Sequence, residues 1–256
     1  MSQLADVQKF NELAKAVASP SDLHRLMQEI SREMGFDHFA LVHHVDLRPR
    51  GTLVDHLVTR DFMALTDYPQ AWIEEYIENK IVSNDPVLLA SQRTMAGFAW
   101  SKIPKIIKMT SAHRELTERT RQAGICDGFT VPAHVPGEMI GSCNFAVGPT
   151  HSPPEDNFMM AQLIGAFAFE GGRQLVARMR DIQDASPVKL TQRQMECIVL
   201  VAKGKSDWEI GKILGLSPET VASYIKSARE RYDVPARIQV VLRACFDGTI
   251  PLSELF

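Results

Sequence analysis

Three aromatic residues, Tyr68, Trp72 and Tyr76, follow one another at intervals of four in the first half of the chain. Residues four apart lie on one face of a helix, so the spacing predicts a shared aromatic face. Asp85 and Trp100 follow. An indole N–H can only donate a hydrogen bond and an ionised carboxylate can only accept one, so the set offers both roles to a small molecule. Each residue also has a structural interpretation, because aromatics four apart usually belong to a core and Asp85 before a proline predicts a helix N-cap.

A later segment adds two polar residues, Ser142 and Asn144, within the strand expected at Met139–Val147. Residues two apart in a strand share a face, so both side chains are expected on the same side of the sheet. A buried polar group needs a hydrogen-bond partner, and in an apolar pocket a ligand can supply it.

The last quarter of the chain has the signals of a different site. Thr191-Gln-Arg-Gln194 and Ser206-Asp-Trp-Glu209 both have the capping-box pattern, a hydroxyl followed three residues later by Gln or Glu. Gly204 and Gly215 suit left-handed helix ends, and Ser217 before a proline predicts the next helix start. Two helices joined by Gly-Leu-Ser have the helix-turn-helix layout, in which the second helix enters the DNA major groove. The polar face of that helix supplies the candidate DNA contacts Thr220, Ser223, Tyr224, Lys226 and Ser227.

The elements that must position these residues alternate between helix and strand up to residue 180 and are helical after it. Helices are expected at Leu4–Ala18, Ser21–Met34 with Ser21 as its cap, Trp72–Glu78, Ser111–Ala123 and Pro154–Arg180. Strands are expected at Phe39–Asp46, Thr52–Thr59, Phe129–His134 and Met139–Val147. The predicted fold class is α+β, an N-terminal α-β-α sandwich with a mostly antiparallel sheet followed by an all-α four-helix helix-turn-helix domain. The expected domains are residues 1–180 and 189–256, joined by a polar linker at 181–188.

The length of the chain is consistent with two domains, since 256 residues can form two separate cores. Residues 189–256 hold ten Lys and Arg against eight Asp and Glu, a net charge of +2, which leaves −5 for the rest of a chain that totals −3. This weak positive charge predicts modest DNA affinity per copy, with dimerisation supplying the remainder. The cysteines lack metal or disulfide spacing and are expected to be small buried residues in a reducing cytoplasm. No signal peptide, membrane span or metal site is expected.

Taken together, the two regions resemble the LuxR-type quorum-sensing transcriptional regulators. Tyr68-Pro-Gln-Ala-Trp72-Ile-Glu-Glu-Tyr76, Asp85-Pro-Val, Phe98-Ala-Trp100 and Gly128-Phe-Thr-Val-Pro132 are similar to the autoinducer-binding domain of that family. Leu190-Thr-Gln-Arg-Gln, Gly204-Lys-Ser-Asp-Trp-Glu-Ile, Leu214-Gly-Leu-Ser and Tyr232-Asp-Val are similar to its helix-turn-helix. Their order along the chain matches that of the family.

The resemblance implies an N-acyl-homoserine lactone as effector, no cofactor and no catalytic residue. Its partners would be promoter DNA, a second copy in a homodimer and, as a further candidate, RNA polymerase. It implies that Trp72 donates to the lactone carbonyl, Asp85 accepts from the amide N–H and Tyr76 donates to the acyl carbonyl. Trp100 would form a flat apolar wall beside the lactone ring. The ligand-binding set is completed by Tyr68, Ser142 and Asn144.

Three positions depart from the family pattern, and one of them is Ile198, where the family usually has a leucine. Asn144 occupies a position where the family often has Ser or Thr, which predicts altered recognition of the first acyl carbons. Gln194 stands where the family usually has Glu, and its amide can still complete a capping box.

The sequence also allows three other interpretations. A metal or hydrolytic enzyme is disfavoured because His43 and His44 should point to opposite faces of a strand, and neither an HExxH nor a GxSxG motif occurs. A response regulator is disfavoured because the first residues are helical rather than an acidic receiver strand. A regulator of this family that responds to a non-lactone molecule, or that binds DNA when empty and is released by ligand, stays open.

Overall fold

The computed structural model describes residues 3–44, 56–58, 63–135, 140–179 and 188–254 of the chain. The chain forms two compact units, one made of Met1–His134 and Met139–Asp184 and the other of Ala185–Phe256. The expected linker at 181–188 lies outside the described residues except for Val188.

A single antiparallel sheet organises the first unit. Its described strands run in the order β2 (His56–Val58), β3 (Met63–Thr66), β1 (His38–His43), β6 (Gly141–Val147), β5 (Asp127–Ala133) and β4 (Phe98–Ala99). All neighbouring pairs are antiparallel, which confirms the predicted sheet type. The expected strand Phe39–Asp46 ends instead at His43, and most of the expected strand Thr52–Thr59 lies outside the described residues. Strand β3 was not predicted.

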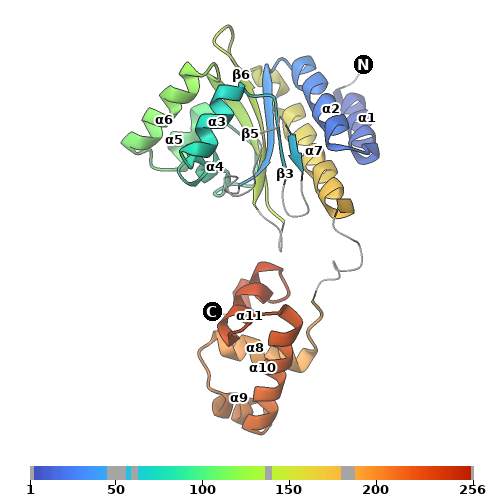
Figure 1. Cartoon of the computed structure of the whole chain (residues 1–256), viewed down its shortest axis with the longest axis vertical. Coiled ribbons are helices and arrows are strands. Elements are labelled where there is room, and N and C mark those ends of the chain that lie inside the picture. Colours follow the sequence, from blue (N-terminus) through green and yellow to red (C-terminus); the bar gives the residue numbers. More distant parts are fainter. Residues whose placement is uncertain (1–2, 45–55, 59–62, 136–139, 180–187, 255–256) are drawn as a thin grey trace. The chain divides into compact units, whose positions relative to one another are not determined.

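Helices cover both faces of this sheet, as expected for an α-β-α sandwich (Figure 1). One layer contains α1 (Gln3–Ala16), α2 (Pro20–Glu33) and α7 (Phe158–Met179), and the other contains α3 (Gln70–Glu78), α4 (Pro86–Ser91), α5 (Ile103–Ile106) and α6 (Ser111–Gln122). Short 3₁₀ turns lie at Ile81–Ser83, Trp100–Lys102 and Glu155–Asn157. Alternate residues of β1, such as Phe39 and Leu41, are buried in the core against α1, α2 and α7. Their neighbours Ala40 and Val42 face the second layer and line a cavity there.

Three helix starts differ from the sequence-based expectation because of prolines and local caps. The N-cap of α2 is Ser19 rather than Ser21, since its Oγ accepts from the Asp22 N–H at 3.2 Å and the intervening proline occupies the first turn. Helix α7 begins at Phe158, after a 3₁₀ turn, and not at residue 154. Helix α3 begins at Gln70, so Tyr68 precedes the helix that carries the other two aromatics of the predicted face.

The second unit consists of α8 (Gln192–Ala202), α9 (Asp207–Leu214), α10 (Pro218–Tyr232) and α11 (Arg237–Phe246), followed by a 3₁₀ turn at Leu252–Glu254. Both predicted capping boxes form, and Ser217 caps α10 by accepting from the Thr220 N–H at 3.2 Å. Gly204 and Gly215 have φ of 76° and 68°, left-handed values that favour glycine. The predicted four-helix arrangement is therefore confirmed.

The cysteines only partly follow the expectation of buried thiols. Cys143 and Cys197 are buried, and desolvation raises the pKa of the Cys143 thiol. Cys126 and Cys245 are half-buried, and Cys126 lies at the cavity wall. No disulfide joins the four.

Candidate ligand cavity and DNA-binding helix

A cavity of about 430 Å³ lies between the sheet and the layer of α3 to α6. Its volume is within the range of small-molecule sites, and most of its wall is apolar. Six of the seven predicted ligand-binding residues line it: Tyr68, Trp72, Tyr76, Asp85, Trp100 and Asn144. The seventh, Ser142, is fully buried behind the cavity wall and does not line it. The chain thus brings together side chains that are up to 76 positions apart, from Tyr68 to Asn144.

Asp85 is the polar centre of the helical side of this cavity. Its Oδ1 caps α4 by accepting from the Val87 N–H at 2.8 Å, and its Oδ2 accepts from the Tyr76 hydroxyl at 2.8 Å. Burial raises the pKa of the Asp85 carboxyl, an effect that these two hydrogen bonds oppose. Burial also raises the pKa of Tyr76 well above its usual range, so this phenol keeps its proton. Each carboxylate oxygen has a further lone pair that a ligand N–H can use.

Trp72 and Tyr68 present polar groups that the protein itself leaves open. Trp72 is buried and packs edge-to-face on Tyr76, with ring centroids 6.1 Å apart. Within the described part of the chain, no acceptor takes the indole N–H of Trp72 and no group hydrogen-bonds to the Tyr68 hydroxyl. Burial raises the pKa of Tyr68, so its hydroxyl is a donor over the physiological range. Both groups are available to a molecule in the cavity.

Trp100 is held against the sheet by a buried hydrogen-bonded chain. Its Nε1–H donates to Thr130 Oγ1 at 2.8 Å, and the Thr130 hydroxyl donates to Asn144 Oδ1 at 2.8 Å. The indole lies so close to Gly128 that a Cβ there would sit 2.9 Å from its Cε2. Gly128 therefore makes room for the ring, and Thr130 fixes its rotation. Thr130 was not predicted, because its pairing with Asn144 depends on the register of β5 and β6.

Ser142 and Asn144 share a face of β6, as predicted, and bond to each other. Asn144 Nδ2 donates to Ser142 Oγ at 3.1 Å, and His44 Nε2 lies 2.9 Å from the same hydroxyl. Burial lowers the pKa of His44 to about 3, so that imidazole is neutral. The expectation that a ligand would supply the partner of Asn144 is wrong, since protein groups already satisfy its amide.

Contacts between helices hold the helical wall of the cavity in place. An ion pair between Arg119 and Glu75 joins α6 to α3. His113, buried on α6, accepts from the Thr110 N–H through Nδ1 and lies with Nε2 3.1 Å from Asn84 Oδ1, next to the start of α4. These partners lie far apart in the sequence, and no local sequence pattern predicts that they meet.

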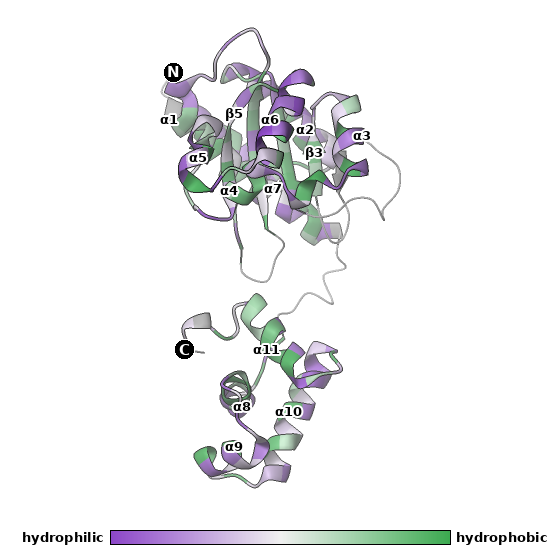
Figure 2. Cartoon of the chain, turned by 90° about the vertical axis from the view of Figure 1, so that its left-hand side faces the viewer, coloured by the Kyte–Doolittle hydropathy of each residue, from purple (hydrophilic) through white to green (hydrophobic). Residues whose placement is uncertain are grey.

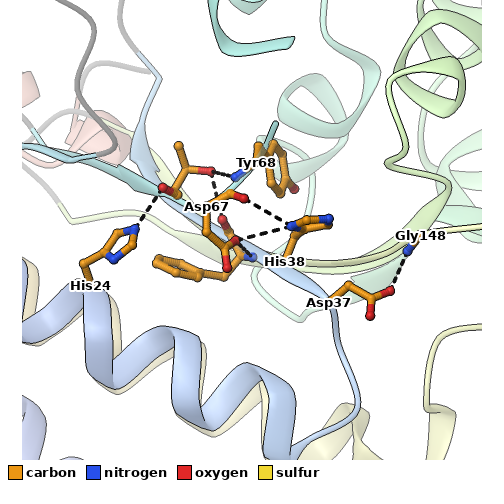
Figure 3. A network of polar contacts seen from close by, with 8 residues as sticks. His24, Asp37, His38, Asp67, Tyr68 and Gly148 are labelled. Atoms are coloured by element: carbon orange, nitrogen blue, oxygen red, sulfur yellow. Dashed lines mark hydrogen bonds and ion pairs between the residues drawn. The ribbon is translucent and has the colours of Figure 1, made fainter. Parts of the chain in front are cut away.

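A polar network lies behind Tyr68, at the ends of the neighbouring interior strands β1 and β3 (Figure 3). Asp67 Oδ1 accepts from the Phe39 N–H at 2.7 Å, and His38 Nδ1 lies 3.7 Å from the same oxygen. The hydrogen bond to Asp67 raises the pKa of His38. The His38 ring also meets Tyr68 edge-to-face at 6.1 Å. The network thus supports one wall of the cavity from outside.

The predicted DNA-contacting residues of α10 fall into two groups. Ser223 and Lys226 are exposed, and Lys226 pairs loosely with Glu230 at 3.9 Å. Tyr224 and Ser227 do not face outward as expected, because Tyr224 packs against the helical core and Ser227 Oγ accepts from Gln194 Nε2 at 3.0 Å.

Thr220 lies at the start of α10, and Gln194, on α8, contacts α10. Thr220 is half-buried beside Ser217, with the two hydroxyl oxygens 3.1 Å apart. The buried Gln194 amide completes the capping box of α8 and also holds α10 through Ser227. The residue that departs from the family pattern therefore links two helices of the unit.

Helix α11 carries an apolar stripe at the surface of the second unit. Ile238, Leu242 and Phe246 recur at intervals of four and are 54%, 63% and 49% exposed. Figure 2 shows this helix largely in the colours of hydrophobic residues. Scattered apolar residues are normal on a surface, but a contiguous row suggests an interface.

A largely apolar cavity with a few convergent polar groups, in a chain that also carries a capped helix-turn-helix unit, defines the class of ligand-binding transcriptional regulators. Comparison with known proteins agrees. Residues 19–171 match the family described as "Autoinducer binding domain", and residues 188–244 match "Bacterial regulatory proteins, luxR family". The chain belongs to the LuxR family of quorum-sensing transcriptional regulators, which are not enzymes.

Named relatives and solved structures support this placement. The chain is 24% identical to the transcriptional activator protein LuxR of Aliivibrio fischeri, over 92% of this chain and 91% of the relative. It is 26% identical to the quorum-sensing regulator RhlR of Pseudomonas aeruginosa, over 88% of each. The crystal structure of Escherichia coli SdiA shares the fold, with a TM-score of 0.66 and 19% identity over 96% of this chain and 98% of that one. A complex of SdiA with octanoyl-rac-glycerol gives a TM-score of 0.65 at 17% identity over 96% of both chains.

Among the residues that the structure describes, no helix is long and apolar enough to cross a membrane. Likewise, no group of three or more His, Cys, Asp or Glu side chains in the described ranges could hold a metal ion.

Proposed function

We propose that the protein binds an N-acyl-homoserine lactone in the cavity and thereby controls its binding to promoter DNA as a dimer. The observation that carries the ligand assignment is the set of open polar groups on the helical side, the Trp72 N–H, the Tyr68 hydroxyl and the Asp85 carboxylate. Two donors and one acceptor match the lactone carbonyl, the acyl carbonyl and the amide N–H of such a molecule. The apolar remainder of the cavity suits its acyl chain.

The contacts of Tyr76 change one role that the family resemblance implied. A phenol has a single proton, and in Tyr76 that proton is donated to Asp85 at 2.8 Å. Tyr76 therefore orients the carboxylate, and Tyr68 becomes the donor to the acyl carbonyl. Trp72 remains the donor to the lactone carbonyl. Trp100, which is anchored by Thr130, remains the apolar wall beside the lactone ring.

The ligand assignment is tested by thermal unfolding of the purified full chain with a panel of acyl-homoserine lactones. A ligand that binds only the folded state stabilises it by about 2.7 kcal/mol at a hundred times its Kd. We expect stabilisation by at least one lactone and none by the matching ring-opened acyl-homoserine, which lacks the lactone carbonyl geometry. A panel in which no lactone stabilises the protein would exclude the proposal.

A non-lactone ligand is the second candidate, and one observation favours including it. The similarly folded SdiA has been solved with octanoyl-rac-glycerol, a molecule with a polar head and an acyl chain. The same panel therefore includes monoacylglycerols. Stabilisation by these and by no lactone would assign the cavity to acylated molecules with a hydroxyl-bearing head.

Control of DNA binding is inferred from α10 and α11. Ser223 and Lys226 are the exposed polar side chains of α10 that can reach bases or phosphates in a major groove. The apolar stripe of α11 fits the same stripe of a second copy, because a two-fold interface joins identical surfaces. Helix α7 is a further candidate for the interface, since Met159 and Leu163 are exposed one turn apart.

The dimer is tested with Leu242→Glu, which places a charge in the α11 stripe. We expect binding to a two-fold symmetric operator to weaken on the order of ten-fold or more, because two contiguous apolar faces no longer pack. Exposed Met95→Glu, on the first unit, serves as the control. Operator binding is measured with and without ligand by gel shift, which also shows whether ligand recruits the protein to DNA or releases it. Unchanged operator affinity in Leu242→Glu would remove α11 from the interface.

A further inference from the structure

The sensing unit concentrates positive charge in one segment of the chain. Between Pro86 and Arg114 there are five Lys and Arg residues and no Asp or Glu. The whole chain carries −3 and residues 189–256 carry +2, which leaves −5 for residues 1–188. Without the five cations that region would carry −10. The segment is therefore strongly basic within an otherwise acidic domain.

The five cations lie on elements that fold together. Arg93 follows α4, Lys102 ends the 3₁₀ turn after β4, Lys105 lies on α5, and Lys108 and Arg114 flank the start of α6. Buried residues of α4, β4 and α5 form one apolar cluster, and the two helices lie on the same side of the sheet (Figure 1). All five charged side chains are exposed. This set of five is here called the basic face.

The cations of the basic face are not engaged by carboxylates. Among the described residues, no ion pair or side-chain hydrogen bond involves any of the five. Four cations of the helix-turn-helix unit, by contrast, pair with carboxylates of that unit: Arg193, Lys205, Lys226 and Arg237. A paired cation must give up its carboxylate before it binds another anion, whereas the basic face has no such partner to release.

An exposed cluster of unpaired cations fits a polyanion, and DNA is the polyanion that the other unit of the same chain binds. DNA held by one unit meets the other at a high local concentration, because the two are covalently joined. Phosphates repel the acidic remainder of the sensing unit, so electrostatics favours the basic face as the side that meets DNA. The recognition helix leaves room for such a contribution, since its exposed candidate contacts are Ser223 and the paired Lys226.

We propose that the basic face binds phosphates of the DNA that flanks the site occupied by α10. This inference rests on the proposed binding of promoter DNA and deepens it, because it gives the sensing unit a direct part in DNA affinity. Contacts of Lys and Arg with phosphates release condensed counterions, so they strengthen binding without regard to base sequence. The sensing unit adds affinity in this way, while α10 contacts the bases.

The experiment measures the Kd of the full chain for a mixed-sequence DNA duplex over a series of NaCl concentrations. Each phosphate contact adds about 0.9 to the slope of log Kd against log salt concentration. The variant Lys102→Gln/Lys105→Gln/Lys108→Gln removes three charges from exposed positions, so its fold should be that of the wild type. We expect its slope to be smaller by about two to three per chain, and its affinity at about 0.1 M salt to be lower by ten-fold or more.

The matched control is Lys9→Gln/Lys15→Gln/Arg32→Gln, which removes the same charge from exposed positions of α1 and α2, on the other side of the sheet. Its slope should equal that of the wild type. Equal slopes in the two triple variants overturn the inference. The single variant Lys105→Gln, which should lower the slope by about one, decides the matter if the triple lysine variant does not fold.

The same variants distinguish DNA from a membrane surface as the partner. The wild-type chain is also mixed with vesicles of phosphatidylcholine and phosphatidylserine. Vesicle binding that is lost in the triple lysine variant, with an unchanged DNA slope, would assign the basic face to anionic lipid and overturn the inference. Absence of DNA binding by the wild-type chain at every salt concentration would instead refute the proposed function on which the inference rests.

Discussion

The two units of this protein differ in how far along the chain their polar side chains find partners. In the helix-turn-helix unit, the caps Thr191, Ser206 and Ser217 all bond to a backbone N–H three residues later. In the sensing unit, Trp100 bonds to a residue 30 positions away and Asn144 to one 104 positions away. These caps of the helix-turn-helix unit depend on local hydrogen bonds, whereas the bonds of Trp100 and Asn144 in the sensing unit exist only once the sheet has paired.

This difference indicates which side chains can be replaced without loss of the fold. A local cap can be removed at the cost of one helix end, because its partners return to water. A cross-strand group in the sensing unit is buried with several partners, so its removal leaves other polar atoms unsatisfied. Gln194 is the exception in the second unit, since it is a local cap that also reaches Ser227 across 33 positions.

The largest expected effect is that of Asp85→Asn on ligand binding. Asn remains a good N-cap, so α4 should keep its start, but an amide N–H₂ can now face the ligand N–H. We expect a loss of about 1–3 kcal/mol of binding free energy, roughly five- to 160-fold in Kd. Ligand-induced thermal stabilisation measures it, with Asp156→Asn, at an exposed position of the same unit, as the charge-matched control. An undiminished ligand response in Asp85→Asn would remove Asp85 from the site.

Thr130→Val tests the non-local character of the sensing unit. Valine has the same shape but cannot accept from Trp100 or donate to Asn144, so two buried groups lose their partner. We expect the unfolding free energy of this unit to fall by about 2 kcal/mol. Calorimetry of the full chain measures it, and the transition of the helix-turn-helix unit should not move. A change below about 0.5 kcal/mol would show that the chain from Trp100 to Asn144 does not stabilise the fold.

Ser217→Ala is the local counterpart and should have a smaller effect. It removes the hydroxyl that accepts from the Thr220 N–H at the start of α10. We expect a loss of about 1 kcal/mol, confined to the helix-turn-helix unit. Ser223→Ala, exposed on the same helix, provides the control and should stay within about 0.5 kcal/mol of wild type. Equal losses in the two variants would contradict the capping role.

The smallest expected effect is a pH dependence from His38, beside the Tyr68 wall (Figure 3). Its folded-state pKa is raised, chiefly by its hydrogen bond to Asp67. The stability it adds is therefore fully present below the unfolded pKa of about 6.5 and is lost as pH rises through the folded pKa. We expect His38→Gln to lower the unfolding free energy more at pH 6 than at pH 8, by a few tenths of a kcal/mol because the charged atoms of the pair are 3.7 Å apart. A difference between wild type and variant that grows with pH would reverse the sign.

Sequence reasoning was most accurate where the determining interactions are local. The capping boxes, the left-handed glycines and the cap at Asp85 were predicted from residues within four positions of each other, and all are confirmed. The Ser19 cap was missed because two serines flank the proline and either could begin a helix. Strand β3 was missed because a four-residue strand offers too little alternation to separate it from a loop.

The cavity residues show the same limit. The family pattern placed Tyr68, Trp72, Tyr76, Asp85, Trp100 and Asn144 around one site, and all six line the cavity. It could not show that the Tyr76 proton is committed to Asp85, that Ser142 lies behind the wall, or that Ser227 faces Gln194. A hydrogen-bonding group can serve only as many partners as it has protons and lone pairs, and which partners take them depends on neighbours brought close by folding.

The amino-acid sequence by itself determined the two-domain organisation, the helix ends of the DNA-binding unit and the residue types available to a ligand, because these follow from short-range patterns. Tertiary structure alone decided which of those polar groups remain open. Strand register puts Thr130 opposite Asn144 and Asn144 opposite Ala40, so these polar groups bond to one another, while the Trp72 N–H and the Tyr68 hydroxyl have no partner among the described residues. The physical reason is that hydrogen-bonding capacity is finite, and only the folded chain settles how it is shared.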